Sequence, residues 1–356
     1  MGSNHSLSHR LADEADQTLQ RLRQFGMLLG RERRTASNFD LPLRKRLWLW
    51  RRGFISEAGA CFDLSEETSH QYLSNYDRAV KTIEINGEAG QILDDKLLFH
   101  GLLTPQFSAF VPDLYYYVSP EGTYPVDTSQ SFSAAIESDS LTDPLVVKTR
   151  TGGGGKGVFM VSPEQVFEAF VDIDQRFEAD GFLVSEFIDQ ATYAESIFPR
   201  STNTIRILTM TDPENTEPFI ARAVHRFGSE NSAPLDNWSS GGVLGRIDRE
   251  SGLLGKCAHR TGEGVIERDD NHPEMNVPIA GTAIPNWDRV VDGILSVARA
   301  NPGVPYVGWD VVITDDPPYF KIIEANRYSG VVTLQSFEPL LDDPRVRRFY
   351  EHHDIL

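Results

Sequence analysis

Four consecutive glycines between two apolar runs constrain the fold of this chain more than any other feature. Gly152 to Gly155 separate the runs at 145–149 and 158–161, which both read as strands. Glycine permits positive φ and leaves backbone N–H groups uncovered, so such a loop can fold closely over phosphate groups. Lys148 ends the first strand and Lys156 lies in the loop, where both supply positive charge. We therefore expect a strand, loop and strand that cover a nucleoside triphosphate.

Two common phosphate-binding motifs do not fit this loop. Gly152, Gly154 and Gly157 match G-x-G-x-x-G, but that motif opens a helix, whereas residues 158–161 read as a strand. The P-loop is excluded because Gly157 follows Lys156 where Ser or Thr would bind magnesium. A strand–loop–strand cover of the kind found in protein kinases remains, and the alternative without a function is a plain hairpin tip.

Length and composition indicate a protein of two or three domains. The chain has 356 residues, and no apolar run reaches the roughly 18 residues of a membrane span. The N-terminus lacks the apolar core of a signal peptide, and two cysteines indicate no disulfide framework. A cytoplasmic enzyme is the default expectation.

The net charge of −18 disfavours sequence-independent binding to nucleic acid. Only seven of the 34 basic residues are lysine, so we hypothesise a halophilic, salt-adapted source, with an acidic protein from a GC-rich genome as the alternative. Residues 1–54 depart from this pattern with 11 basic and five acidic residues. Within them, residues 40–54 mix Arg and Lys with Leu and Trp, which suits a peripheral membrane contact or a docking surface for a partner. The alternative is a helix whose tryptophans pack on the next domain.

Hydrophobic periodicity predicts helices and strands along most of the chain. Helices are expected at 8–35, 72–85, from Asp94 onward, at about 163–180 and at 286–301. Short strands and turns are expected at 104–135, and further strands at 182–188, 204–210, 218–224, 306–313 and 319–325. The Gly-, Ser- and Asn-rich segment 228–245 is expected to be a long functional loop.

The strongest chemical signal lies near the C-terminus, in two strands joined by a turn. Side chains alternate along a strand, so Glu324 and Asn326 project from one face, and Asp310 lies beside them if the two strands are antiparallel neighbours. Two carboxylates and an amide oxygen are hard ligands that suit Mg²⁺ or Mn²⁺ bound with nucleotide phosphates. The alternative is a solvated strand end.

Taken together, these segments resemble the ATP-grasp superfamily from about residue 94 to 332. The segments 203–206, 236–242 and 308–310 are most similar to the sugar-transfer-associated ATP-grasp family. A more distant likeness is to the glutamate ligases that modify ribosomal proteins and to D-alanine–D-alanine ligases. The resemblance implies an α+β fold in which two subdomains clamp ATP behind a helical N-terminal extension. We expect a basic helical extension at 1–55, a helical pre-ATP-grasp region at 56–135, a small subdomain at 136–200 and a large one at 201–356.

The resemblance also implies a role for each matching position. Residues that would bind ATP are Lys96 and Lys148 (adenine or phosphates), the lid Gly152, Gly153, Gly154, Gly155, Lys156 and Gly157, the hinge Glu186, Phe187 and Ile188, and Asp189 or alternatively Glu195 (ribose). Residues that would act on the reacting phosphate are Arg206, Arg226 and Lys156, and the metal ligands would be Asp310, Glu324 and Asn326.

Several of these positions have a plain structural alternative. Arg206 could form an ion pair only, Asn203 could shape a turn, and Asp189 could be a solvated loop acid. His225 is more typical of a structural than of a catalytic histidine.

The expected function is an ATP- and Mg-dependent carboxylate–amine ligase that works through an acyl phosphate. Its substrates would be a small-molecule acid and an amine, in the modification of cell-surface polysaccharide or of a glycan precursor. Two alternatives stay open: a small-molecule kinase that uses the same lid and metal, and a non-catalytic nucleotide-binding module. The loop 229–245 is expected to line the acceptor side.

Overall fold

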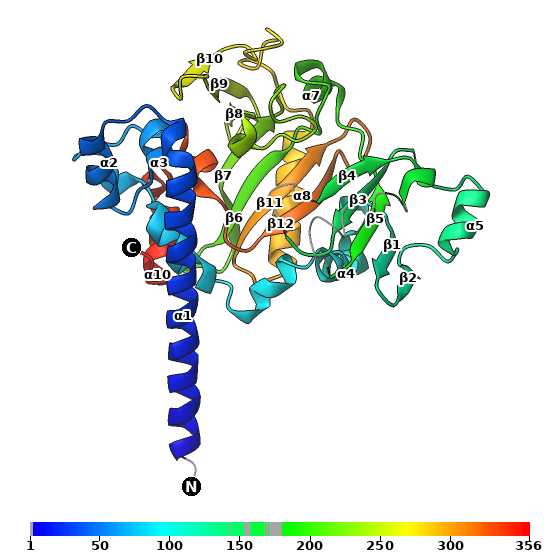
Figure 1. The fold of residues 1–356 in the computed structure, drawn as a ribbon, viewed down its shortest axis with the longest axis horizontal. Helices are drawn as coiled ribbons and strands as arrows, with labels where there is room; N and C mark the ends of the chain where they lie inside the picture. The colour runs from blue at the N-terminus through cyan, green and yellow to red at the C-terminus, as the bar shows by residue number, and fades with distance from the viewer. Residues whose placement is uncertain (1–2, 142, 153–156, 167, 169, 171–179) are drawn as a thin grey trace.

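Two antiparallel sheets and a long N-terminal helix make up the molecule (Figure 1). The computed structural model describes residues 3–141, 143–152, 157–166, 168, 170 and 180–356. Helix α1 (Ser3–Thr35) runs along one side of the larger sheet and extends beyond it, while the smaller sheet lies at the opposite side of the molecule.

The smaller sheet has the strand order β2-β1-β5-β3-β4. Its strands are β1 (Leu114–Ser119), β2 (Gly122–Pro125), β3 (Leu145–Thr149), β4 (Val158–Val161) and β5 (Phe182–Glu186). The predicted strands on either side of the glycines are therefore present, and they pair with each other. The sheet already begins at residue 114, upstream of the subdomain boundary that we expected at 136. Of the helix expected at about 163–180, residues 163–165 form one 3₁₀ turn, and most of the rest lies outside the described residues.

The larger sheet has the strand order β10-β9-β8-β7-β6-β11-β12. Its strands are β6 (Ile205–Thr211), β7 (Pro218–Phe227), β8 (Val243–Ile247), β9 (Leu254–Arg260), β10 (Ile266–Asp269), β11 (Tyr306–Ile313) and β12 (Phe320–Asn326). Four of them occupy the predicted positions. The other three, β8 to β10, extend the sheet beyond the expected loop.

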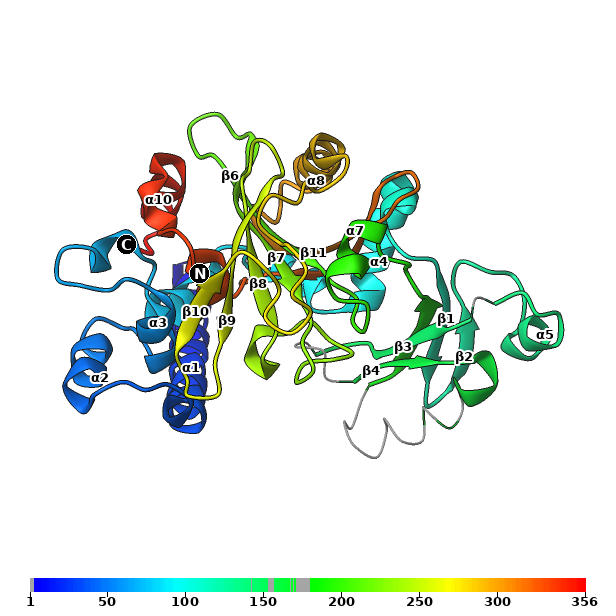
Figure 2. The ribbon, with the colours of Figure 1, turned by 90° about the horizontal axis from the view of Figure 1, so that it is seen from above.

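Helices cover both faces of the larger sheet. The described helices after α1 are α2 (Leu43–Trp50), α3 (Ser56–Cys61), α4 (Lys96–Phe107), α5 (Phe132–Glu137), α7 (Thr192–Ile197), α8 (Trp287–Ala300), α9 (Val331–Gln335) and α10 (Pro344–His352). Of these, α5 packs in the core of the smaller sheet. Helices α4 and α8 pack on one face, and α2, α3, α9 and α10 belong to the core of the other. Figure 2 shows α8 and α10 on opposite sides of the strands. None of the described helices is both long and apolar enough to cross a bilayer.

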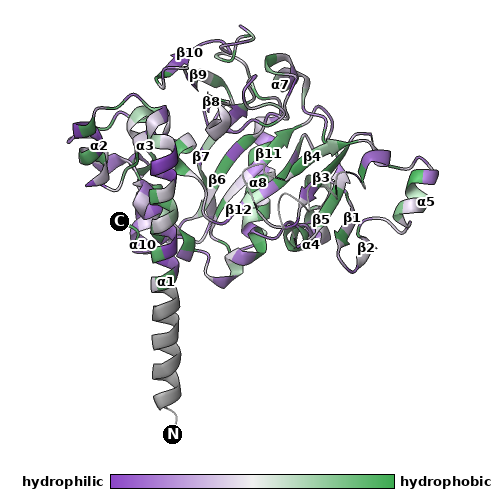
Figure 3. Ribbon diagram, in the orientation of Figure 1, coloured by the Kyte–Doolittle hydropathy of each residue, from purple (hydrophilic) through white to green (hydrophobic). Residues whose placement is uncertain are grey.

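Alternation along the central strands separates core from cavity. Ile205 and Ile207 of β6 pack into the α8 face, whereas Arg206 between them points to the opposite face. Trp309 and Val311 of β11 repeat this pattern on either side of Asp310. Hydrophobic colour accordingly dominates the strands in Figure 3, interrupted at polar positions. The apolar positions hold the sheet against α8, which leaves the polar positions available for chemistry.

The N-terminal region is folded onto the larger sheet. Leu49 of α2 and Phe54 are buried in the same core as Leu208 and Met210 of β6. The helix expected at 72–85 is instead a series of short turns, which include a π-turn at Asp77–Lys81 and a 3₁₀ turn at Thr82–Glu84. These turns lie against α1, so long-range packing has replaced the regular helix that the periodicity indicated.

Candidate active site

A cavity of 490 Å³ opens between the two sheets. Its walls come from β3, β4 and β5 of the smaller sheet and from β6, β7, β11 and β12 of the larger one. Ten of the predicted site residues line it: Lys96, Lys148, Glu186, Phe187, Ile188, Arg206, Arg226, Asp310, Glu324 and Asn326. Residues separated by more than 200 positions in the chain thus share one site.

The three predicted metal ligands lie on one face of a strand pair. Asp310 of β11 is directly opposite Glu324 of β12, and Gly308 is opposite Asn326. The register shifts after Asp310, which leaves Ile323 without a cross-strand partner. This bulge reverses the alternation of β12, so that Ile322 packs in the core while Glu324 faces the cavity.

The donors available at this face fit a hard divalent cation. Glu324 and Asp310 contribute carboxylates. The amide nitrogen of Asn326 donates to the Gly308 carbonyl at 3.2 Å, which leaves its amide oxygen as a further donor. Oxygen donors of this kind suit Mg²⁺ or Mn²⁺ rather than a softer metal.

Two arginines compensate the charge of buried Asp310. Arg206 donates from Nε and Nη2 to the two carboxylate oxygens, and Arg226 Nη2 lies 3.3 Å from Oδ1. Burial on its own would raise the pKa of the Asp310 carboxyl, but Arg206 and Arg226 outweigh it and hold that pKa below its ordinary value. Asp310 is therefore an anion in the folded protein, and its pairing with Arg206 is the structural alternative considered above.

On the opposite wall, two lysines lie close to Glu324. Burial lowers the pKa of Lys148 to about 8, and repulsion from Lys96 acts in the same direction. Lys96 Nζ donates to the Gly152 carbonyl at 2.6 Å and lies 3.9 Å from Glu324 Oε1. The pKa of Glu324 is raised by burial and then by the charge of Asp310. A phosphate placed here would relieve the repulsion between the lysines.

The base of the glycine loop is tied to helix α4. Asp95 caps α4 by accepting from Leu97 N and Leu98 N, and it pairs with Arg150 at 2.6 Å. The backbone N–H of Lys96 donates to the Arg150 carbonyl. Gly157 has a φ of +77°, and a Cβ there would lie 2.7 Å from Thr149 Cγ2, so the position accepts only glycine without strain.

Four of the expected lid residues cannot be placed. Gly153, Gly154, Gly155 and Lys156 lie outside the described residues. Their role over the phosphates stays a prediction.

The expected adenine hinge follows β5 at the edge of the cavity. Glu186 closes this strand, and Lys321 Nζ lies 3.6 Å from its Oε1. Phe187 and Ile188 line the cavity beyond it. Asp189 and Glu195 are exposed and are not among the lining residues, so the cavity does not bring either acid to a ribose position.

Sequence reasoning did not assign a role to Asp236 and Thr204, which also line the cavity. Asp236 accepts from the backbone N–H of Thr204 at 2.8 Å and lies 3.4 Å from Arg226 Nε. Desolvation raises the pKa of Asp236, although Arg226 opposes the shift. The only hint in the sequence was the position of Asp236 in the segment 236–242.

Asn203 and His225 have structural roles in this region. Asn203 is buried, donates to the Ala194 and Phe198 carbonyls, and accepts from Gly228 N. His225 is fully buried, and burial lowers its pKa to about 3. Neutral His225 donates from Nδ1 to the Arg226 carbonyl at 3.1 Å and accepts from the Tyr193 hydroxyl at 2.7 Å. It is held inside the sheet and supplies no proton to the cavity.

The family is decided by the extent of one match. The model of the sugar-transfer associated ATP-grasp family matches residues 81–339, which span both sheets and every described residue of the cavity. The chain belongs to this family. The fold of this sugar-transfer-associated ATP-grasp protein is thus the expected α+β ATP-grasp fold.

Solved structures give weaker likenesses, and no curated protein matches the chain by sequence. D-Alanine–D-alanine ligase from Helicobacter pylori is 10% identical with a TM-score of 0.43, and the match covers 73% of this chain and 61% of that one. D-Ala:D-Ser ligase from Enterococcus faecalis is 15% identical with a TM-score of 0.42, and the match covers 73% of this chain and 62% of that one. Biotin carboxylase from Campylobacter jejuni is 12% identical with a TM-score of 0.42, and the match covers 73% of this chain and 47% of that one. The ATP-grasp protein thus spans less than two thirds of each of these three chains.

Proposed function

We propose that this protein is an ATP- and Mg²⁺- or Mn²⁺-dependent carboxylate–amine ligase that works through an acyl phosphate. The observation that carries the proposal is the arrangement of Asp310 and Glu324 opposite Lys96 and Lys148 across one cavity, with Arg206 at its floor. Anionic oxygens for a cation and cationic groups for phosphates are the two requirements of phosphoryl transfer from ATP.

The chemistry needs positioning and charge rather than a nucleophilic side chain. A carboxylate oxygen of the acid attacks the γ-phosphorus, the bond from that phosphorus to the bridging oxygen breaks, and ADP leaves. The amine then attacks the acyl carbon, the bond between that carbon and the phosphate oxygen breaks, and inorganic phosphate and a proton are released. Lys148 and Arg206 would stabilise the negative charge on the transferring group. Both cysteines are buried and neither lines the cavity, which agrees with a route without a covalent enzyme intermediate.

The cation would be held by Asp310, Glu324 and Asn326. When bound, it would supply positive charge that offsets the negative charge developing on the transferred phosphate. The charge of Asp310 is already balanced by Arg206 and Arg226, so Glu324 is the carboxylate with the largest electrostatic need for a cation.

We also propose a biological setting for the reaction. The acid or the amine would belong to a cell-surface polysaccharide or to one of its precursors, in agreement with the sugar-transfer association of the family. A cytoplasmic site of action, with residues 40–54 contacting the membrane or a glycosyltransferase, is part of this proposal. The lysine-poor, acidic composition further supports the hypothesis of a halophilic source.

The experiment that tests the ligase is a screen for ADP release with pairs of acids and amines, followed by mass measurement of the product. An amide, formed only when both partners are present, is the expected product. A phosphomonoester formed from a hydroxyl compound would instead identify a kinase. ATP binding without ADP release across the whole panel would identify a nucleotide-binding module.

A further inference from the structure

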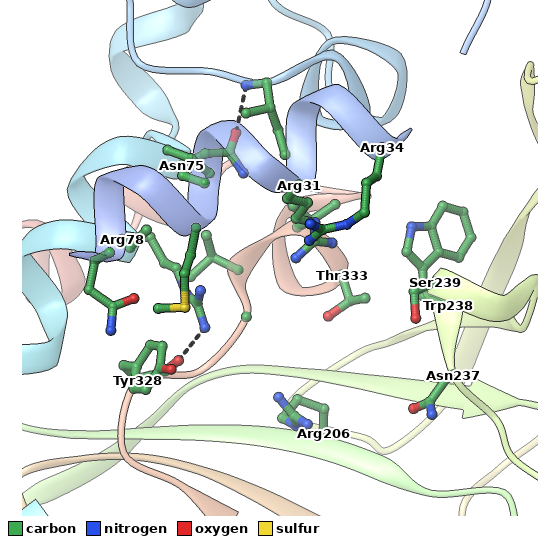
Figure 4. Close-up of a pocket in the computed structure, with 18 of the residues that line it drawn as sticks. Arg31, Arg34, Asn75, Arg78, Arg206, Asn237, Trp238, Ser239, Tyr328 and Thr333 are labelled. Atoms are coloured by element: carbon green, nitrogen blue, oxygen red, sulfur yellow. Dashed lines mark hydrogen bonds between the residues drawn. The ribbon is translucent and has the colours of Figure 1, made fainter. Parts of the chain in front are cut away.

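A second cavity, of 390 Å³, adjoins the nucleotide cavity on the side of the N-terminal helix. Arg206, Arg226 and Asn237 line both cavities, so the two meet at the arginines expected to contact the transferred phosphate. The remaining walls come from α1, from residues 75–79, from the turn at Trp238–Ser240 and from residues 328–333 (Figure 4). No residue of the smaller sheet is among its described lining.

This cavity is strongly cationic. Its described lining includes Arg31, Arg34, Arg78, Arg206 and Arg226 and contains no aspartate or glutamate. Figure 4 shows Arg31 and Arg34 projecting from α1 into the same space above Thr333, with Arg206 on the opposite side. Concentrating like charge around a concave site is costly unless an anion binds there.

Only some of these arginines are neutralised by the protein. Arg206 and Arg226 share Asp310, Arg226 also lies near Asp236, and Arg31 pairs with buried Glu57 at 2.6 Å. Arg34 and Arg78 are not part of any of these ion pairs.

Arg78 and Arg34 therefore provide positive charge without a carboxylate among the described residues. Arg78 donates to the backbone carbonyls of Tyr328 and Ser329 and stacks on the Tyr328 ring at 4.7 Å. Burial lowers the pKa of Arg78, and the nearby positive charges of Arg31 and Arg206 act in the same direction. Arg34 is exposed and forms no ion pair within the described chain.

We infer that this cavity binds the acid substrate, and that this acid carries a second anionic group, a carboxylate or a phosphate, recognised by Arg31, Arg34 and Arg78. The reacting carboxylate would lie near Arg206 and Arg226, where the two cavities meet, and the second anion would lie toward α1. This inference rests on the proposed ligase function and adds the substrate class. It also assigns α1 a role in specificity, since two of the three arginines belong to that helix.

The test measures binding of three acids by calorimetry, with the nucleotide site saturated by Mg²⁺ and a non-hydrolysable ATP analogue. Butyrate offers one anionic group, glutarate offers two carboxylates, and 3-phosphoglycerate offers a carboxylate and a phosphate. We expect at least one of the two double anions to bind about tenfold more tightly than butyrate. Which of the two is preferred identifies the second group.

Variants on α1 provide a matched pair. Arg34→Gln should weaken the preferred double anion by about tenfold and leave butyrate and the ATP analogue unchanged. Arg33→Gln removes the same charge from the adjacent exposed residue, which is not among the lining residues, and should have no such effect. Arg78→Gln provides a second test inside the cavity, with thermal unfolding to check its fold.

Three results would overturn the inference: equal affinity for all three acids, no detectable binding of either double anion, or equal losses from Arg33→Gln and Arg34→Gln. The ligase proposal fails separately. Arginine-dependent binding of a double anion without ADP release from any acid and amine pair would leave the anion site in place and remove the ligase. ADP release with an acid of one anionic group, unchanged in Arg34→Gln, together with no binding of either double anion, would keep the ligase and remove the anion site.

Discussion

Arg206 and Asp310 lie directly opposite each other on β6 and β11, and the guanidinium donates to both oxygens of the carboxylate. Since Arg226 also approaches the same carboxylate, one buried anion is shared by two partly buried cations, of which Arg226 also lies near Asp236. The ion pair therefore helps to stabilise the folded sheet, and it also belongs to the candidate site.

This arrangement predicts that Asp310→Asn destabilises the protein. Removing the anion leaves Arg206 and Arg226 without their shared partner, so the free energy of unfolding should fall by about 3–5 kcal/mol. Urea unfolding of the wild type and the variant measures the difference. Equal unfolding midpoints with equal m-values would contradict a structural role for this carboxylate.

Glu324→Gln is consequently the cleaner test of the cation site. Its carboxylate has a raised pKa, so neutralisation should not reduce stability, whereas ADP release that depends on Mg²⁺ should fall by about 100-fold or more. Asp316→Asn, in the exposed turn between β11 and β12, is the matched control and should behave as the wild type. Retained Mg²⁺-dependent turnover in Glu324→Gln would remove Glu324 from the ligand set.

The pKa of Lys148 predicts proton uptake on nucleotide binding. At about pH 8.5 most Lys148 side chains are neutral in the free protein, and a bound phosphate favours the charged form. ADP binding should then take up roughly half a proton or more at that pH and almost none at about pH 6.5, and affinity should decline above about pH 8.

Calorimetry in buffers of different ionisation enthalpy measures this uptake. Lys148→Met should abolish it, and Lys256→Met, at an exposed lysine of β9, should not. The same uptake in wild type and Lys148→Met would assign the proton to another group.

Helix α2 allows a precise test of the membrane proposal. Leu43 and Leu47 are exposed by 67% and 44%, while Leu49 on the same helix is fully buried. Deleting residues 1–54 would uncover the core, so the double variant Leu43→Gln/Leu47→Gln is the better choice. It should reduce binding to anionic lipid vesicles by several-fold at low salt, measured by vesicle co-sedimentation. Equal binding of the variant and the wild type would end the membrane proposal.

Local sequence pattern predicted the central strands of the larger sheet. The positions of β6, β7, β11 and β12, and the shared face of Glu324 and Asn326, follow from alternation, which acts over a few residues. The bulge at Ile323 could not be predicted from the sequence, although it is the bulge that places Glu324 on the same face of the sheet as Asp310.

Long-range packing explains what the sequence did not predict. Burial of Asp236 depends on its contacts with Thr204, 32 positions away, and α1 becomes a cavity wall only when it packs on the turns at 77–84. Strand β10 (Ile266–Asp269) is largely exposed and polar, so it lacked the apolar pattern that predicts a strand.

The two cavities differ in which parts of the protein build them. The nucleotide cavity is lined by both sheets, whereas the described lining of the arginine-rich cavity comes from α1, from the N-terminal segment around residues 55 and 75–79, and from the side of the larger sheet. In the proposed mode of binding, the second anion of the acid would therefore be recognised away from the smaller sheet, and the two ligands would meet only at Arg206, Arg226 and Asn237. A relative of this protein could acquire a new acid by changing α1 without disturbing how it handles ATP.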